Sequence, residues 1–350
     1  MSSPRPPALV DWPLAVRTAR RLAPAGPRLS PAEATSVVAE LREVTVRAEE
    51  HVRAVTGLVP PGEPGAATVV DRGGWAQANV AGFRVVVEPL GERLFEGKKP
   101  PSRAAAAVTA RVAGVQMGAT LAWLSSKVLG QYEVFLPQER AGRLVLVAPN
   151  IVETERSLGV DPSDFRLWVA LHEVTHRTQF TAVPWLHGHV RGEVDALLSA
   201  AHLDDPVRLF RALKEGVVDR RPLVEVLQSP QQREVLERVT AFMSLLEGHA
   251  EHVMDGVGPG VVPTVAHIRE RFQARRGQRT GPLDRLLRKV LGLDLKALQY
   301  AEGAVFVREC VEAVGMDGFN RVWESPELLP TRHEVREPRL WVRRVHGVAA

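Results

Sequence analysis

Three stretches of the chain share an arrangement typical of helix starts, and this feature most constrains the fold. Each offers a residue that can cap a helix, then proline, then an acid or amide three residues after the cap. The stretches are Ser30–Glu33, Asp161–Asp164 and Ser229–Gln232. Each leads into a long segment with helical periodicity, so the chain is predicted to be mainly α-helical.

Helical periodicity also dominates most of the remaining sequence. It predicts a helix after Gly74 and helices over residues 103–129, 190–202, 206–217, 230–257, 261–275, 282–291 and 293–314. Strand signals are few. Residues 132–136 and 143–149 are apolar and β-favouring, and a charged turn containing glycine separates them, so they are predicted to form a hairpin. The predicted fold class is therefore mainly α with a small β hairpin or sheet.

Composition excludes several classes of protein. The net charge of +4 is small for 350 residues and the arginines are scattered, so we expect no nucleic-acid surface. Residues 104–124 carry Arg111 and Gln116, which favours a buried core helix over a membrane span. The N-terminal residues lack the apolar core of a signal peptide, and Cys310 has no second cysteine with which to form an internal disulfide. We expect a cytoplasmic protein; its oligomeric state is not fixed by the sequence.

The sequence His172-Glu173-Val174-Thr175-His176 lies within a predicted helix that runs from Asp161 to about Val183. At 100° per residue, one stripe holds Phe165, Trp168, His172, His176 and Gln179. Two imidazoles one turn apart can bind the same metal ion. Glu173 sits beside the stripe, where it can take a proton from a water bound to the metal. The histidines could instead be satisfied by carboxylates or backbone carbonyls, but their inward-facing context favours metal.

A catalytic zinc site usually has a third protein ligand. The extended motif HExxHxxGxxH is absent, because Gln179 and Ala182 occupy its last two conserved positions. Glu247, in SLLEGHAEHVMD, is predicted to share a stripe with Leu236, Met243, Ala250 and Met254. A carboxylate buried on that stripe needs a cation, which a shared metal would supply.

Alternatives to this third ligand remain at the sequence level. Glu247 could form a salt bridge to an arginine, and His187 and His189, expected on a surface loop, are rival ligands. Gly248 could permit the close approach of another backbone, and Glu251 could orient a ligand histidine.

These motifs carry a resemblance to a known family. HEVTH followed by Glu247-Gly248-His249-Ala250 resembles the gluzincin arrangement. More closely, the chain resembles the zincin-like metallopeptidases of actinobacteria, which are often associated with biosynthesis of the deazaflavin coenzyme. The matching stretches cover nearly the whole chain: VDRGGWAQAN, LHEVTHRTQF, VPWL, EGHAEHVMD, QYAEGAVFV and NRVWESPELLPT. One departure is Arg177, where zincins usually have an uncharged residue; we expect it to reach solvent or a partner acid.

The resemblance implies a zincin-like metallopeptidase fold over one domain of residues 1–350 and a single zinc ion. Within that domain, 1–100 would be an N-terminal helical part, 101–315 the metal-site core and 316–350 a C-terminal packing segment. His172, His176 and Glu247 would be the ligands and Glu173 the general base. Tyr300 and His267 are the candidates to stabilise an oxyanion, although Tyr300 could simply lie at the edge of the core.

The resulting functional prediction is a zinc-dependent hydrolase, most consistent with a metallopeptidase acting on a peptide or protein. In zincins an edge strand binds extended substrate, and the hairpin over 132–149 is placed in the sequence to do so. Two alternatives stay open. The metal could stabilise a non-catalytic structural or regulatory protein, or the chain could act in the deazaflavin pathway without peptidase activity.

Overall fold

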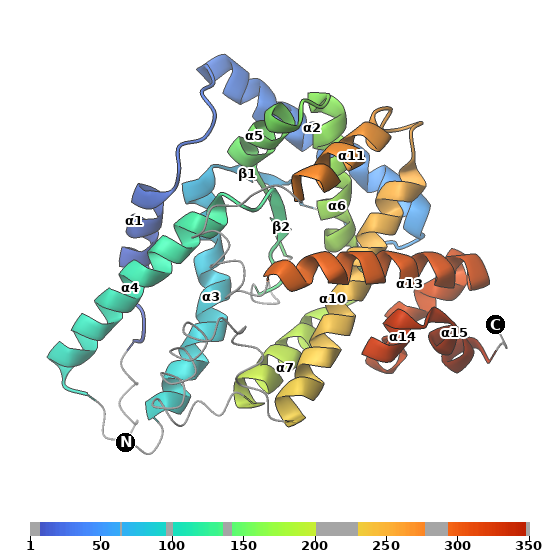
Figure 1. The fold of residues 1–350 in the computed structure, drawn as a ribbon. Helices are drawn as coiled ribbons and strands as arrows, with labels where there is room; N and C mark the ends of the chain where they lie inside the picture. Colours follow the sequence, from blue (N-terminus) through green and yellow to red (C-terminus); the bar gives the residue numbers. More distant parts are fainter. Residues whose placement is uncertain are drawn as a thin grey trace. The chain divides into compact units, whose positions relative to one another are not determined.

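The computed structural model describes residues 8–63, 65–95, 101–135, 142–200, 230–276 and 293–347 (Figure 1). The chain divides into two compact units. The first consists of Met1–Arg47 and Pro64–Glu173, and the second of Ala48–Glu63 and Val174–Ala350. Two of the three boundaries along the chain fall inside continuous helices, α2 (Pro31–Thr56) and α6 (Pro162–Ala182), and the third follows Glu63. Folding as one domain over the whole chain stays a prediction.

Helices dominate both units, which confirms the predicted fold class. Besides α2 and α6, the first unit contains α1 (Trp12–Leu22), α3 (Arg72–Phe95), α4 (Arg103–Ser125) and α5 (Ala148–Leu158). The second contains α7 (Trp185–Ala200), α10 (Pro230–Val257), α11 (Val265–Arg276), α13 (Leu293–Phe319), α14 (Arg332–Arg336), α15 (Pro338–His346) and the short 3-10 helices Asn320–Trp323 and Pro326–Leu328. The helices predicted over 206–217 and 282–291 lie outside the described residues.

The predicted helix starts form as their residues suggest. The Ser30 amide donates to the Glu33 carboxylate at 2.6 Å, and the Glu33 amide donates to Ser30 Oγ at 3.3 Å, which is a reciprocal capping box at the start of α2. At the start of α6 the Asp164 amide donates to Asp161 Oδ1 at 2.9 Å. α10 begins at Pro230, and its predicted cap, Ser229, lies outside the described residues.

A small three-stranded sheet lies in the first unit, in the order β1-β3-β2. β1 (Thr68–Val70) is parallel to β3 (Leu144–Val147), and β2 (Gly130–Tyr132) is antiparallel to it. The predicted antiparallel pairing is present, but the first strand is Gly130–Tyr132 and not 132–136. The second strand ends at Val147 because the chain turns into α5 at Ala148 and Pro149. All four residues of β3 are buried, as expected of a strand covered on both faces.

The two faces of the sheet contact different helices. On one face Val145 and Val147 pack with Ala19, Trp75, Ala76, Leu121 and Ala122 from α1, α3 and α4. Gly130 pairs with Leu146, so both belong to the opposite face. A Cβ atom built at Gly130 would lie 2.6 Å from Cγ of Glu173, which shows that α6 crosses close to this face.

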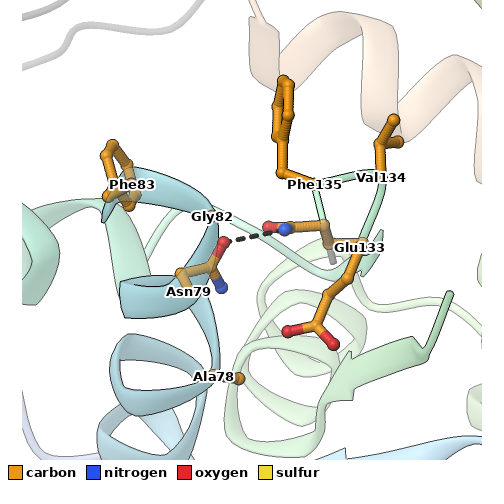
Figure 2. Close-up of a pocket in the computed structure, with 8 residues that line it drawn as sticks. Ala78, Asn79, Gly82, Phe83, Glu133, Val134 and Phe135 are labelled. Carbon is orange, nitrogen blue, oxygen red and sulfur yellow. Dashed lines mark hydrogen bonds between the residues drawn. The ribbon is translucent and has the colours of Figure 1, made fainter. Parts of the chain in front are cut away.

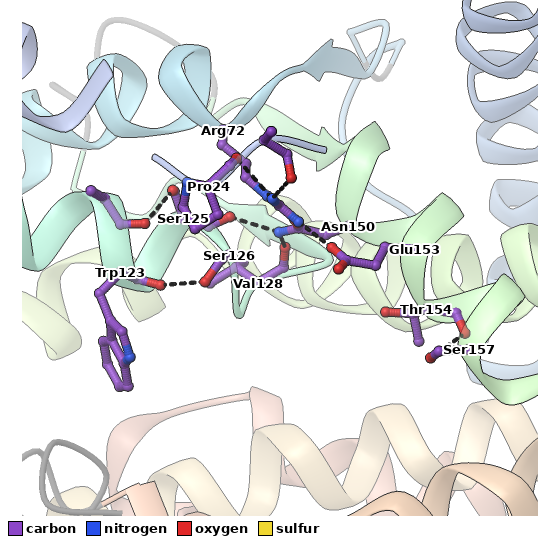
Figure 3. A network of polar contacts seen from close by, with 12 residues as sticks. Pro24, Arg72, Trp123, Ser125, Ser126, Val128, Asn150, Glu153, Thr154 and Ser157 are labelled. Atoms are coloured by element: carbon purple, nitrogen blue, oxygen red, sulfur yellow. Dashed lines mark hydrogen bonds and ion pairs between the residues drawn. The ribbon is translucent and has the colours of Figure 1, made fainter. Parts of the chain in front are cut away.

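Arg72 is the centre of a buried polar network that ties several segments of the first unit together (Figure 3). Its guanidinium donates to Asn150 Oδ1 at 2.7 Å and to the carbonyl oxygens of Pro24 and Ala25, both at 2.9 Å, and it forms an ion pair with Glu153. The Asn150 amide in turn donates to the carbonyls of Ser125 and Val128, each at 2.6 Å. The network therefore fixes the start of α5, directly after β3, against the end of α4.

The helix over 104–124 is less buried than predicted. In α4, Val108, Val112 and Val115 are 60%, 53% and 47% exposed. Its buried stripe instead holds small residues that allow close packing on α1. A Cβ atom at Gly114 would lie 2.7 Å from the Asp11 carbonyl oxygen, and one at Gly118 would lie 2.5 Å from that of Ala15. Among the described residues, none of the helices combines the length and apolar character needed to cross a membrane.

The second unit is organised around the crossing of α10 and α13, which Figure 1 shows. Gly248 and Gly303 meet at the crossing, where a Cβ atom at Gly248 would lie 2.1 Å from the Gly303 carbonyl carbon. The expectation that Gly248 permits close approach of another backbone is confirmed.

The second unit also contains an aromatic cluster that includes Phe306, Phe319, Trp323 and Trp341. The two tryptophans of the C-terminal segment are buried, as predicted for an ordered segment. Cys310 is also buried in α13, and burial raises the pKa of its thiol.

Candidate metal centre

α6 carries the HEVTH sequence through the core. Phe165 and Trp168 are buried on the helix and stack on one another with ring centroids 5.9 Å apart, which anchors its first half. His172 and His176 follow one turn apart and are partly buried, and Glu173 is 7% exposed. The predicted placement of the two histidines on one side of a buried helix is thus present in the structure.

Glu247 on α10 lies beside these histidines. One candidate ligand atom from each of His172, His176 and Glu247 can be chosen so that all three lie within 4.8 Å of one another. The distance from His176 Nε2 to Glu247 Oε2 is 3.5 Å. A tetrahedral zinc ion with ligand bonds of about 2.1 Å holds its ligand atoms about 3.4 Å apart. Two imidazoles and one carboxylate at this spacing therefore fit a zinc ion with three protein ligands.

The hydrogen bonds of the Gln179 side chain determine which ring nitrogen of His176 carries the proton. The Gln179 side chain approaches the Leu246 carbonyl oxygen at 3.0 Å, and a carbonyl can only accept, so the group that faces it is the amide NH₂. The Gln179 oxygen then faces His176 Nδ1 at 3.0 Å. His176 Nδ1 must carry the proton, which places the ring's lone pair on Nε2, the atom that faces Glu247.

His249 completes this arrangement on the other side of Gln179. Its Nδ1 lies 3.0 Å from Gln179 Nε2 and accepts a hydrogen bond from it, so in the neutral ring the proton is on Nε2. His249 is fully buried against Phe319 and Trp323. Burial lowers the pKa of His249 to about 3, so the ring stays neutral at ordinary pH and keeps Nδ1 as an acceptor.

Glu173 is positioned by α6 and by the sheet. It follows His172 directly, so it points about 100° round the helix from that ligand candidate. Its side chain lies over Gly130 of β2, where a Cβ atom would come within 2.7 Å of the Glu173 carboxyl carbon and 3.0 Å of Oε1. Glycine at position 130 therefore makes the room that the Glu173 carboxylate occupies.

Arg177, the residue that departs from the zincin pattern, pairs with an acid as expected. It is 3% exposed and forms an ion pair with Glu49 of α2. Burial raises the pKa of Glu49, and the charge of Arg177 opposes that effect. The arginine thus has a structural partner away from the two histidines.

The structure places the remaining candidates as follows. His187 and His189 lie in the first turns of α7 rather than on the predicted loop, because the helix begins directly after Pro184. Their rings contact Phe180 and Phe242, respectively. His267 is exposed on α11, and Glu251 pairs with Arg269 at 3.3 Å. Tyr300 belongs to α13, but its side chain lies outside what the structure describes, so its role stays a prediction.

Two residues of the site escaped the sequence reasoning. Gln179 was placed on the stripe of the two histidines, but no partner was predicted for it, although a polar residue on a buried stripe is itself a signal of a specific partner. Gly130 carried no local signal, because its role depends on the approach of Glu173 from another part of the chain.

Comparison with known proteins agrees with this geometry. A sequence model of a family described as zincin-like metallopeptidases matches residues 10–342. A solved structure from Chloroflexus aurantiacus, described as that of a candidate hydrolase with a novel fold, is 32% identical with a TM-score of 0.69. The alignment covers 96% of this chain and 98% of that one. No curated protein matches the chain. The actinobacterial and deazaflavin parts of the resemblance stay predictions.

Proposed function

Because the chain belongs to the zincin-like metallopeptidase family, we propose that it is a zinc-dependent hydrolase that cleaves peptide bonds. The observation that carries this proposal is the convergence of His172, His176 and Glu247 within 4.8 Å, with Glu173 next to the first of them. Two imidazoles, one carboxylate and an adjacent carboxylate that is not a ligand form the set of groups that a hydrolytic zinc site requires.

Each group has a distinct role in this proposal. Zinc, when bound, lowers the pKa of a water molecule and polarises a substrate carbonyl. His172, His176 and Glu247 would hold the ion, and Gln179 would keep the Nε2 lone pair of His176 directed at it. Glu173 would take the proton of the attacking water and deliver it to the leaving amine nitrogen. Tyr300 remains the proposed donor to the oxyanion.

β2 is the proposed binding strand for the substrate main chain. The backbone bonds between Glu133 and Arg143, and between Leu129 and Val147, link β2 and its flanks to β3 at every second pair. In an antiparallel ladder the intervening residues direct their N–H and C=O groups to the other side. Gly130, beside Glu173, therefore presents its backbone away from β3, where an extended peptide can pair with it.

Metal content and cleavage test this proposal together. We expect near-stoichiometric zinc in the wild-type protein and its loss in His172→Ala and Glu247→Ala. The zinc-loaded wild type would then be incubated with a proteome-derived peptide library and the new termini read by mass spectrometry. Glu173→Gln should keep its zinc and lose at least about 100-fold of the cleavage rate, because it lacks the general base.

Three other outcomes would contradict the third ligand, the catalytic role or the whole proposal. Zinc retained by Glu247→Ala would move the third ligand to another residue. Stoichiometric zinc with no cleavage of any library peptide would favour the non-catalytic, metal-stabilised alternative. A wild-type protein that takes up no zinc even after reconstitution would contradict the proposal as a whole.

A further inference from the structure

A hollow of about 200 Å³, open to solvent, lies in the first unit beside β2. One wall is α3, which contributes Ala78, Gly82 and Phe83; the other is the segment after β2, which contributes Val134 and Phe135 (Figure 2). Figure 2 shows the rings of Phe83 and Phe135 rising to the same side of the hollow. This volume is smaller than the roughly 300–1,000 Å³ typical of pockets for whole small molecules, so the hollow suits a single side chain.

The polar groups of the hollow are already paired, so it offers little to a charged ligand. The Gln131 amide donates to Asn79 Oδ1 at 2.7 Å, the dashed line in Figure 2, and the Asn79 amide donates to the Trp75 carbonyl at 3.0 Å. Glu133 is 5% exposed, and Arg143 binds its two carboxylate oxygens at 2.8 and 3.2 Å. What is left to recognise is apolar and aromatic surface.

The alternation of side chains along β2 determines which residues of a paired peptide would face Glu173 and which would face the hollow. Successive side chains of a strand point to opposite faces, so Gly130 belongs to the face that α6 crosses and Gln131 to the face of α3. Directly opposed residues of paired strands point to the same face. In a peptide paired with β2, the residue opposite Gly130 would face Glu173, and the residue opposite Gln131, its neighbour in the peptide, would face the hollow.

We propose that this hollow is a specificity pocket for a large apolar or aromatic side chain of the substrate, next in sequence to the residue that faces Glu173. The inference rests on the proposed function, because it takes β2 as the strand that pairs with substrate. It adds a substrate class: peptides with a bulky neutral side chain close to the cleaved bond.

Filling the pocket tests the inference. Ala78→Phe places a ring in the hollow, and Ala81→Phe, the matched control, places the same ring on an exposed position of α3. Gly82→Leu serves as a second filling variant, because a Cβ atom there meets Phe135 at an ordinary 3.6 Å. The zinc-loaded proteins are compared by circular dichroism and by the residues found around the cleaved bonds of the peptide library.

The expected result is a wild-type preference for large apolar side chains at one position. Ala78→Phe and Gly82→Leu should shift that position toward glycine and alanine by about tenfold or more in relative kcat/KM. Ala81→Phe should keep the wild-type profile. Cleavage without any preference, or an unchanged profile in both filling variants, would overturn the pocket while leaving the hydrolase proposal standing.

A second measurement covers the case in which no peptide is cleaved and the hydrolase proposal fails. N-acetylphenylalanine methylamide and its alanine counterpart are added to the full-length protein, and binding is followed by saturation-transfer NMR. Binding of the phenylalanine probe alone, lost in Ala78→Phe and kept in Ala81→Phe, supports an apolar side-chain site without the enzyme. Equal signals for the two probes, or equal binding by the two variants, overturn it.

Discussion

At the scale of single residues, the site depends on groups that are not ligand candidates themselves. Gln179 fixes the tautomer of His176 because its amide is held by the Leu246 carbonyl and by a neutral His249. Partners of this kind typically contribute 10- to 100-fold to metal affinity. The buried stripe of α6 therefore supplies both the ligand candidate His176 and the residue that orients it, Gln179.

Replacing Gln179 with leucine should weaken zinc binding by about 10- to 100-fold, because His176 Nδ1 loses its acceptor. Competition with a chromogenic chelator measures this dissociation constant. Thr181→Ala is the control, since its hydroxyl donates to carbonyls of its own helix, those of Arg177 and Thr178. Unchanged zinc affinity in a folded Gln179→Leu protein would show that the glutamine does not position the ligand.

Gly130→Ala should separate catalysis from metal binding. The new Cβ atom would lie 2.6 Å from Glu173 Cγ, so the flexible carboxylate side chain has to move out of its place. We expect a loss of library cleavage of about 100-fold or more, with zinc content unchanged.

Gly188→Ala in α7 controls for this substitution, because none of the residues that the structure describes lies within 4 Å of a Cβ atom there. It should keep full activity and gain up to about 1 kcal/mol of stability. Wild-type activity in Gly130→Ala would exclude Glu173 as a base that acts from the observed position.

At the scale of helices, the pair α10 and α13 determines where Glu247 lies. The two backbones approach at Gly248 and Gly303, so closely that Cβ atoms at these positions would fall 2.1 and 1.9 Å from backbone atoms of the other helix. Backbone cannot move aside as a side-chain end can. Glu247, the residue before Gly248, is therefore buried in the core because two glycines let α10 and α13 approach this closely.

Gly248→Ala and Gly303→Ala should each lower the free energy of unfolding by about 3 kcal/mol or more, because the helices must separate. Urea unfolding followed by circular dichroism measures the loss. Gly192→Ala in α7, where a Cβ atom would meet no atom of the described part of the chain within 4 Å, should not be destabilised. Wild-type stability in both crossing variants would contradict the close packing described for α10 and α13.

Elements that depend on neighbouring residues could be predicted from the sequence, and those that depend on contacts between distant residues could not. α2 and α6 were predicted because Ser30 and Asp161 carry their own capping signals, and Glu247 because periodicity marks a buried carboxylate. β1 was missed because three residues leave almost no pattern, and its pairing with β3 joins distant parts of the chain. The bridge from Gln179 to Leu246 likewise joins residues 67 positions apart.

At the scale of the whole molecule, zinc should stabilise the fold against heat. A ligand that binds only the folded state adds about 4 kcal/mol at a thousandfold excess over its dissociation constant. For chains of 150–250 residues each kcal/mol moves the Tm by about 2 to 4 °C. We expect added zinc to raise the Tm of the wild type by several degrees in a thermal-shift assay, and excess chelator to reverse it.

The matched variants show whether this shift belongs to the proposed site. His172→Ala should lose the shift because it lacks a ligand, and Glu173→Gln should retain it because the carboxylate of Glu173 is not one of the proposed ligands. A shift of wild-type size in His172→Ala would place the bound zinc elsewhere on the chain.

The buried cysteine of α13 can be used to measure how often the core around that helix opens to solvent. Cys310 is the one thiol in 350 residues, and burial raises its pKa, so a thiol-specific dye should react with it only in molecules that have transiently opened. Labelling in native buffer should be slower than in urea by a factor of about 10³ or more, read from the absorbance of the released dye. Equally fast labelling in both buffers would show that the core around α13 is open to solvent on the time scale of the reagent.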